Sequence, residues 1–477
     1  MDGTLNVSPP KIIQGGMGAG VSWWMLAQAV SKLGQLGVVS GTAIDLILAR
    51  RLQDGDAGGH IRRALDHFPF PDVAARVWDK YHVVGGKPAD QPYKSVPMHS
   101  QKPSREIVEL CIVANFVEVF LAREGHENPV GINFLEKIQL PHLPSIYGAM
   151  LAGVTYILMG AGIPTRIPGV LDRFAHQESA TYSIHVSGAN NGCETSMVFD
   201  PREYLKGSLP ELQRPYFLPI IASNALAALM LQKSNGRVDG FVIEGPTAGG
   251  HNAPPRGKLH LSESGEPIYG ERDIVDYGKI RELGLPFWIA GGYASSQKLR
   301  EALAVGAAGI QVGTAFAFCE ESGMKREYRE HLLNESRAGR ARVFTDAIAS
   351  PTGFPFKVAQ MENSVSEAGT YQGRNRICDL GYLRETYGKP DGSLGYRCPS
   401  EPVDIYLSKG GAVESTVGRK CLCNALMANI GMAQTRKDGY MEQPLITCGD
   451  DLAGIARFMR PGGGSYSAAD VIAELLS

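Results

Sequence analysis

The sequence predicts an α/β protein built on a (β/α)8 barrel (a TIM barrel), with an insertion after the second βα unit, an elaboration before strand five and a C-terminal extension. Short apolar runs alternate with glycine-rich turns and amphipathic stretches, a rhythm typical of parallel βα units. Eight such runs occur, which is the number of strands that closes a parallel barrel. The chain of 477 residues is long for a plain barrel, so added segments are expected.

The eight apolar runs are expected to form the barrel strands in chain order. They are Lys11–Gly15, Gly37–Gly41, Val130–Phe134, Thr155–Gly160, Phe217–Ser223, Gly240–Gly245, Pro286–Gly291 and Gly309–Thr314. The clearest helices between them are Ser22–Leu33, Arg105–Arg123 and Ser295–Val305. Parallel strands bring their carboxyl ends to one face of the barrel, where barrel enzymes carry their active sites.

Three segments do not fit the βα rhythm. Residues 54–104 are rich in Gly, Pro, His and charge, and residues 179–216 hold an extra strand candidate and the polar loop GANNGCETS. Residues 351–477 follow the last βα unit and end in an expected helix at Ser467–Leu476. We therefore expect a barrel over residues 1–350, with the first two segments as insertions, and an extension over 351–477 that forms a lid or a small subdomain.

The amino-acid composition indicates which kinds of partner and which cellular compartment to expect. The 47 basic and 49 acidic residues nearly balance, which argues against nucleic acid as a partner. The first residues lack the features of a signal peptide, and the best apolar run, 148–163, is too short and too broken by glycine to span a membrane. The eight cysteines lack the density of a disulfide scaffold, so a reduced, cytoplasmic protein is expected.

Five cysteines gather in the C-terminal extension: Cys378, Cys398, Cys421, Cys423 and Cys448. This bias allows a zinc or iron–sulfur site. However, the only close pair is Cys421 and Cys423, and no CxxC knuckle occurs. The alternative is a set of small buried thiols, and the spacing favours it, so no metal ligand is predicted.

The turn QGGMGAG follows the first strand and contains Gly15, Gly16 and Met17. It is not a dinucleotide fingerprint, because its spacing is not GxGxxG and the second strand ends in Ser40–Gly41 instead of an acid. Because glycine has no side chain, a flat ring could approach the backbone of this turn closely. The alternative interpretation is a tight turn that binds no ligand.

Two further features follow later strands. His251 comes directly after Gly249 and Gly250, behind strand six, and histidine suits proton transfer near neutral pH. Glycine turns at Gly291–Gly292 and Gly313–Thr314 each precede a helix on successive strands. Paired turns of this kind form the usual phosphate site of a barrel, because backbone N–H groups and helix dipoles face the anion.

The motifs IIQGGM, EGPTAGGH, AGGY and GAAGIQVGTAF, in this order, resemble the nitronate monooxygenase (2-nitropropane dioxygenase-like) family over roughly residues 11–357. That family includes an FMN-dependent enoyl reductase branch. The resemblance implies FMN as cofactor, with His251 as the catalytic base. It implies flavin contacts for Gly15, Gly16, Met17, Asn133, Gly249, Gly250, Gly291, Gly292, Gln311, Gly313 and Thr314.

The resemblance implies an FMN-dependent oxidoreductase that oxidises alkyl nitronates or nitroalkanes with oxygen. One departure leaves the substrate open, because Thr247 and Ala248 stand where many members carry an acid, and the acid here comes earlier, at Glu244. An NAD(P)H-dependent enoyl reductase acting on enoyl thioesters, with an acyl carrier protein as partner, is the first alternative. A barrel isomerase or synthase without flavin, binding a phosphorylated metabolite, is the second. A non-catalytic partner subunit is the third, and a homo-oligomer is compatible with each.

Overall fold

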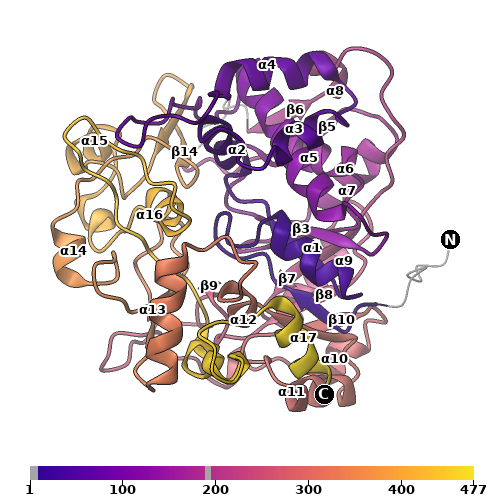
Figure 1. Ribbon diagram of the computed structural model, residues 1–477, viewed down its shortest axis with the longest axis vertical. Coiled ribbons are helices and arrows are strands. Elements are labelled where there is room, and N and C mark those ends of the chain that lie inside the picture. Colours follow the sequence, from indigo (N-terminus) through magenta and orange to yellow (C-terminus); the bar gives the residue numbers. More distant parts are fainter. Residues whose placement is uncertain (1–8, 189–194) are drawn as a thin grey trace.

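The computed structural model describes residues 9–188 and 195–477, and the predicted loop GANNGCETS lies mostly outside these ranges. A parallel eight-stranded sheet forms its centre, in the order β1-β11-β10-β8-β7-β4-β3-β2 (Figure 1). The strands are β1 (Ile12–Gln14), β2 (Gly37–Ser40), β3 (Val130–Leu135), β4 (Tyr156–Gly160), β7 (Tyr216–Ile221), β8 (Phe241–Glu244), β10 (Phe287–Ala290) and β11 (Gly309–Val312). All eight fall on the predicted runs.

The sheet closes on itself between β1 and the residue before β2. Gln14 N donates to Leu36 O at 2.9 Å, and Leu36 N donates to Ile12 O at 3.1 Å. Ile13 and Leu36 form a parallel bridge there. The prediction of a (β/α)8 barrel is thus confirmed.

Alternate strand residues fill the barrel interior. The buried cluster consists of Ile13, Leu36, Val38, Tyr156, Leu158, Leu218, Val242, Trp288 and Ala290. Trp288 is fully buried and its Nε1 donates to Pro10 O at 2.7 Å, so the amino-terminal end of the barrel is plugged. The packed interior leaves the carboxyl ends of the strands as the place for a ligand.

Helices connect the strands and cover the barrel. They are α1 (Trp24–Lys32), α2 (Ile44–Gln53), α5 (Arg105–Arg123), α6 (His142–Leu151), α7 (Ile167–Ala175), α9 (Asn224–Lys233), α10 (Tyr277–Arg281), α11 (Ser296–Ala304), α12 (Thr314–Ala317) and α13 (Arg326–Arg337), with the 3-10 turn η1 (Glu271–Asp273). The predicted helix at 105–123 has the bounds of α5, whose N-cap is Ser104. No helix in the described ranges has the length and apolar character needed to cross a membrane.

The two expected insertions contain more regular structure than their composition indicates. Residues 54–104 form α3 (His60–Leu65) and α4 (Pro71–Tyr81), which pack on α5. Proline occupies the first turn of α4, where it is tolerated because no intrahelical N–H is needed. The second insertion forms an antiparallel hairpin of β5 (Ala180–Ser183) and β6 (Ser196–Phe199), followed by α8 (Pro201–Tyr204).

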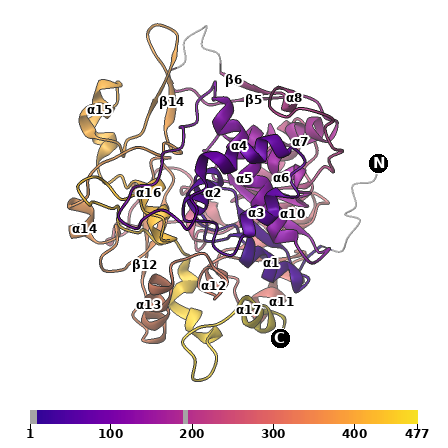
Figure 2. The ribbon, with the colours of Figure 1, turned by 45° about the horizontal axis from the view of Figure 1, so that its top comes forward.

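Much of the C-terminal extension lies against one side of the barrel, and its last residues, in yellow, pass next to α11 and α12 (Figures 1 and 2). Its β13 (Phe356–Ala359) pairs with β12 (Val343–Asp346) and with β9 (Gly250–His251) from the barrel loop, in one antiparallel sheet. The other elements are α14 (Ala368–Gln372), β14 (Glu385–Gly388), β15 (Leu394–Arg397), α15 (Val403–Ser408), η2 (Val413–Thr416), α16 (Leu422–Asn429), η3 (Asp450–Phe458) and α17 (Ala468–Leu476). The terminal helix predicted at 467–476 is α17, capped by Ser467.

Candidate active site

A cavity of about 580 Å³ opens at the carboxyl ends of the barrel strands. Residues at or just past the end of each of the eight strands line it: Gly15, Thr42, Leu135, Ala161, Ala222, Gly245, Gly291 and Gly313. The extension completes the wall with Phe354, Phe356, Leu426, Thr447, Cys448 and Asp451. The volume is within the range of sites that hold a cofactor or a small ligand.

All twelve residues that the sequence singles out lie on the wall of this one cavity. They are Gly15, Gly16, Met17, Asn133, Gly249, Gly250, His251, Gly291, Gly292, Gln311, Gly313 and Thr314. Residues nearly 300 positions apart meet there, because they lie in the last residues of strands of the same closed sheet or in the loops that follow those strands. The geometry brings the set together, while the roles of its members stay predictions.

A buried network holds the QGGM turn after β1. The Gln14 side chain donates from Nε2 to Val38 O at 3.1 Å and accepts at Oε1 from Val38 N at 3.0 Å. Ser22 Oγ donates to Gly15 O and accepts from Met17 N, both at 2.9 Å. The turn is therefore fixed before any ligand binds, and its glycines present bare backbone to the cavity.

Two buried amide oxygens on the cavity wall have no hydrogen-bond partner within the described ranges. They are Asn133 Oδ1 and Gln311 Oε1. Asn133 Nδ2 donates to Gly16 O at 3.2 Å, which orients the amide. A Cβ on Gly16 would stand 2.4 Å from Asn133 Cβ, so glycine is required where these two segments meet. Buried acceptors are nearly always paired, so this wall is suited to a ligand that offers N–H donors.

The loop after β8 is tied to the extension. Lys357 Nζ donates to Pro246 O at 2.9 Å and pairs with Asp450 Oδ1 at 2.7 Å. A Cβ on Gly249 would stand 2.6 Å from the carbonyl carbon of Cys448. Glycine is therefore required at 249 because the backbone of the extension packs against this position. The sequence does not reveal this contact.

His251 lies on β9, opposite Phe356 of β13. Its Nε2 is 2.7 Å from Ser350 Oγ, and its ring meets the Phe356 ring edge-on at 4.7 Å between centroids. Burial lowers the pKa of His251 to about 4. The imidazole is therefore neutral near pH 7 and able to accept a proton.

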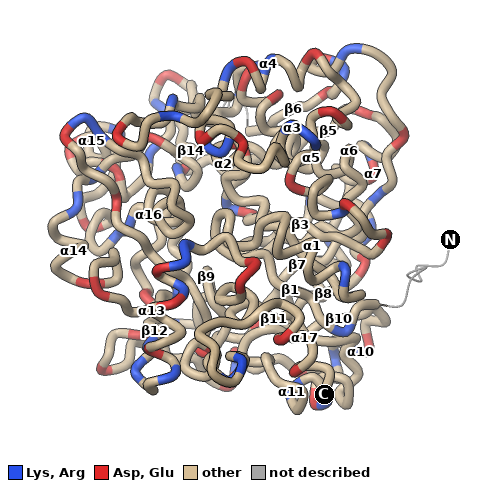
Figure 3. Tube along the Cα trace, viewed as in Figure 1, with Lys and Arg blue, Asp and Glu red and all other residues tan. Residues whose placement is uncertain are grey.

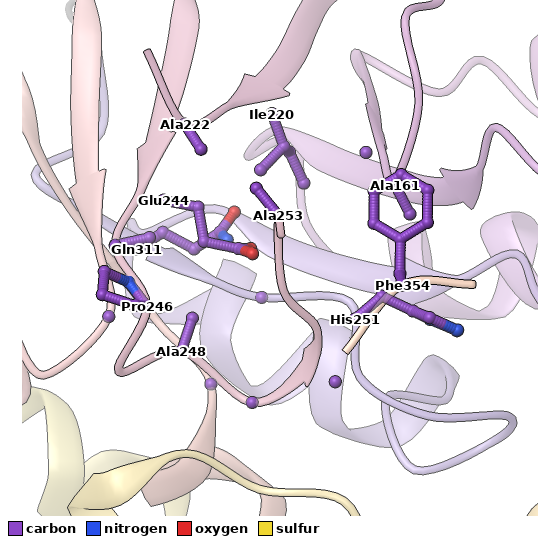
Figure 4. Close-up of a pocket in the computed structure, with 18 of the residues that line it drawn as sticks. Ala161, Ile220, Ala222, Glu244, Pro246, Ala248, His251, Ala253, Gln311 and Phe354 are labelled. Carbon is purple, nitrogen blue, oxygen red and sulfur yellow. The ribbon is translucent and has the colours of Figure 1, made fainter. Parts of the chain in front are cut away.

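Glu244, the last residue of β8, also lines the cavity. Burial raises its pKa to about 8, so the carboxyl group is largely protonated at neutral pH. Figure 4 shows Glu244 and Gln311 together on one side of the cavity, with His251 and Phe354 together on another. Glu244 ends a barrel strand, and this place is a usable sequence signal for an active-site residue, whereas nothing in the sequence around Ser350 points to its contact with His251.

The two glycine turns after β10 and β11 lie side by side, because these strands are paired. Gly291 and Gly292 have φ values of 92° and 71°, which a side chain would strain. Thr314 begins α12, and its Oγ1 accepts from Gly449 N at 2.8 Å, so part of its hydrogen-bonding capacity serves the extension.

The remaining wall has a polar part, which includes Thr42, Ser223, Arg256, Tyr269 and Asp273. Its apolar part is formed by Ile220, Ile221 and Ala222 at the end of β7, by Leu226 of α9, and by Ala253, Pro254, Phe354 and Leu426. Ala161, Ile220 and Phe354 project toward the same space (Figure 4). Such a surface accepts an alkyl group and excludes water.

Comparison with known proteins places a family match on this site. The nitronate monooxygenase family model matches residues 211–346, which carry Gly249, Gly250, His251, Gly291, Gly292, Gln311, Gly313 and Thr314. A nitronate monooxygenase of Pseudomonas aeruginosa is 36% identical over 121 residues, which cover 24% of this chain and 32% of that protein. One from Paraburkholderia phytofirmans is 35% identical over 167 residues, which cover 33% and 42%. The matches thus span between about a third and two fifths of these relatives.

Solved structures that align with the chain include FabK from Thermotoga maritima, at a TM-score of 0.47 and 16% identity, covering 99% of this chain and 93% of that one. Nitroalkane oxidase from Streptomyces ansochromogenes aligns at a TM-score of 0.46 and 17% identity, covering 98% and 95%. The segment 211–346, which carries His251 and both glycine turns, matches the nitronate monooxygenase family model.

Proposed function

We propose that the chain is an FMN-dependent oxidoreductase that oxidises alkyl nitronates or nitroalkanes with oxygen. The observation that carries the proposal is a neutral imidazole, that of His251, on the wall of a largely apolar cavity. Two amide oxygens without a partner in the described residues and the paired glycine turns line the same cavity. The family match and the relatives named nitronate monooxygenase support it.

The residues present fit FMN. A flavin ring carries an N–H donor, which suits the unpaired oxygens of Asn133 and Gln311. The glycines of the QGGM turn leave its backbone bare for a flat ring, and the turns at 291–292 and 313–314 suit the phosphate. When bound, FMN supplies the electron transfer between substrate and oxygen.

In this mechanism His251 removes the proton from the carbon that bears the nitro group. The carbon–hydrogen bond breaks, the proton moves to the imidazole, and the electron pair is left on the nitronate. Ser350 holds the imidazole at Nε2, and the apolar wall receives the alkyl chain. The protonated carboxyl of Glu244 serves as a hydrogen-bond donor inside the cavity.

Anaerobic rapid mixing tests the proposal. The flavin absorbance of the purified protein is expected to fall quickly with an alkyl nitronate and to stay unchanged with NADH or NADPH. Rapid reduction by NAD(P)H but not by nitronate would contradict nitronate oxidation and support the enoyl reductase alternative. A protein that binds no flavin would favour the barrel that acts on a phosphorylated metabolite.

A further inference from the structure

One carboxyl group of the C-terminal extension, that of Asp451 in η3, lines the candidate active site and has no role in the proton transfer to His251. We propose that the Asp451 carboxyl and the phosphate of bound FMN share one proton. The chain would then bind the phosphate next to a protonated partner instead of a second anion. This inference rests on the proposed binding of FMN, and it names the residue that sets how the phosphate is recognised.

The extension packs against both glycine turns through the two residues that precede this carboxyl group. Gly449 N donates to Oγ1 of Thr314, the first residue of α12, at 2.8 Å. Asp450 N donates to Thr247 O at 3.1 Å. The Thr247 side chain borders the other turn, because a Cβ on Gly291 would stand 3.0 Å from its Oγ1. The extension therefore reaches the end of the cavity where the phosphate is proposed to bind.

The Asp451 carboxyl interacts with a backbone donor of the first turn. The N–H of Ala294, two residues after Gly292 and directly before the N-cap of α11, acts on this carboxyl as a hydrogen-bond donor. Arg457 Nη2 donates to Ala294 O and so holds the same residue in place. Backbone N–H groups at the beginning of a helix are the donors that a phosphate uses. Asp451 thus lies among the donors of the proposed phosphate site.

The charges around the two turns do not balance a second anion. Neither turn contains a charged side chain, and Arg256, on the loop after β8, is the one lysine or arginine among the described residues of the cavity wall. In the described part of the chain, the charged groups that act on the Asp451 carboxyl are Arg457 and Asp450, which have opposite signs. Asp450 itself pairs with Lys357 at 2.7 Å. A carboxylate and a dianionic phosphate at this place would therefore repel each other.

Burial favours the protonated form of the Asp451 carboxyl. It raises the pKa of this group above its ordinary value, against the opposing effects of Arg457 and of the Ala294 N–H. A phosphate monoester loses its second proton at about pH 6. Two acids in one site hold their last common proton more tightly than either acid does alone, because the proton removes the repulsion between them.

A shared proton makes the binding of FMN depend on pH. FMN and riboflavin have the same ring and ribityl chain, and only FMN carries the phosphate. At pH values where both acids are ionised before binding, each FMN that binds takes up one proton, so its association constant is expected to fall about tenfold per pH unit. The association constant of riboflavin is expected to change much less over the same range, because riboflavin brings no second acid to the site.

Titration of the flavin-free, full-length protein with FMN and with riboflavin, from about pH 6 to about pH 9, tests the inference, with flavin fluorescence as the readout. In Asp451→Asn the amide donates to the phosphate without a titrating proton. FMN affinity of this variant is expected to be independent of pH and to exceed that of the parent at the alkaline end. Asp450→Asn is the matched control, since its carboxylate faces Lys357, and it is expected to keep the slope of the parent.

Proton uptake is the second readout. In weakly buffered solution at about pH 8, the parent is expected to take up about one proton per FMN bound, and Asp451→Asn none. Riboflavin binding shows in each variant that the flavin site is folded. Equal pH dependence for FMN and riboflavin in the parent would overturn the inference, and so would a parent-like slope in Asp451→Asn. Either result leaves the proposed function in place, whereas a chain that binds neither flavin overturns the proposed function and this inference together.

Discussion

At the scale of single residues, the central group is His251. Its imidazole is neutral because burial disfavours the charged form, and Ser350 Oγ at 2.7 Å fixes its orientation. A neutral base in an apolar pocket accepts a carbon-bound proton without first losing one of its own.

Replacing His251 by alanine tests this role. Turnover of a nitroalkane by His251→Ala is expected to fall about 10²- to 10⁴-fold, the usual contribution of a general base. Bound flavin, measured after denaturation, is expected to stay unchanged. His67→Ala, at an exposed histidine on the insertion, is the matched control. Unchanged turnover in His251→Ala would remove the imidazole from the mechanism.

The lowered pKa of His251 also predicts the pH dependence. kcat/KM for a neutral nitroalkane is expected to decline only as pH falls toward about 4, instead of near the ordinary value of 6.5. The free energy of unfolding is expected to change in the same direction. Between pH 6.5 and about 4 the unfolded chain binds a proton at His251 and the folded chain does not, so the free energy of unfolding decreases as pH falls through this range. A decrease of kcat/KM with a midpoint near pH 6.5 that is seen in the parent protein and not in His251→Gln would contradict a buried neutral base.

Residue-level prediction from the sequence succeeds where a motif follows a strand. Gly15, His251 and Gly313 could be placed at the same face because parallel strands share a polarity. Ser350 could not be found in this way, since its contact with His251 joins residues 99 positions apart through the β9–β13 pairing.

At the scale of elements, the main chain of the loop from Gly245 to His251 packs directly against the main chain of the extension. Gly249 faces Cys448 and Gly449, where an added Cβ would be 2.6–2.7 Å from main-chain atoms. Lys357 reinforces the contact through Pro246 O. The loop that carries the base is therefore supported from outside the barrel.

An alanine at Gly249 is expected to push the extension's backbone away from the loop. We expect Gly249→Ala to lower the free energy of unfolding by about 1–3 kcal/mol, the usual cost of overpacking, and to reduce turnover. Gly245→Ala is the control, because its Cβ would make only ordinary contact, at 3.6 Å from Ala290 O. Thermal unfolding of both variants measures the difference, and equal midpoints would show that the contact relaxes freely.

The strands and long helices were predictable because each is a strongly patterned local segment. The helices α3 and α4 were concealed by glycine and proline, although the buried face of α4, formed by Val73, Val77 and Tyr81, follows helical spacing. The two-residue strand β9 was not predictable, since only its distant partner β13 makes it a strand.

At the scale of the whole molecule, the extension is part of the cavity wall. Basic and acidic residues are interspersed along the chain trace (Figure 3), in keeping with a net charge of −2. The expected boundary at residue 350 falls in the connection between β12 and β13, which are paired strands. The division into a barrel of residues 1–350 and a separate extension stays a prediction. The strand pairing across the boundary argues against independent folding of residues 1–350.

A chain that ends at Ser350 is therefore expected to be insoluble or to bind no flavin. It would lack the strand that pairs with His251 and would expose the surfaces of α1, α11 and α13 that pack on α17 and η3. Co-expression with residues 351–477 is expected to restore a soluble, flavin-binding complex. A soluble, flavin-loaded fragment of residues 1–350 would instead establish the barrel as autonomous.

The central claim is that the cavity at the carboxyl ends of the strands holds FMN. The absorption spectrum of the purified full-length protein, with identification of the cofactor released on denaturation, tests it most directly. The account predicts flavin bands in the near-ultraviolet and blue and about one FMN per chain. A colourless protein that releases no flavin, and takes up none when FMN is added, would contradict it.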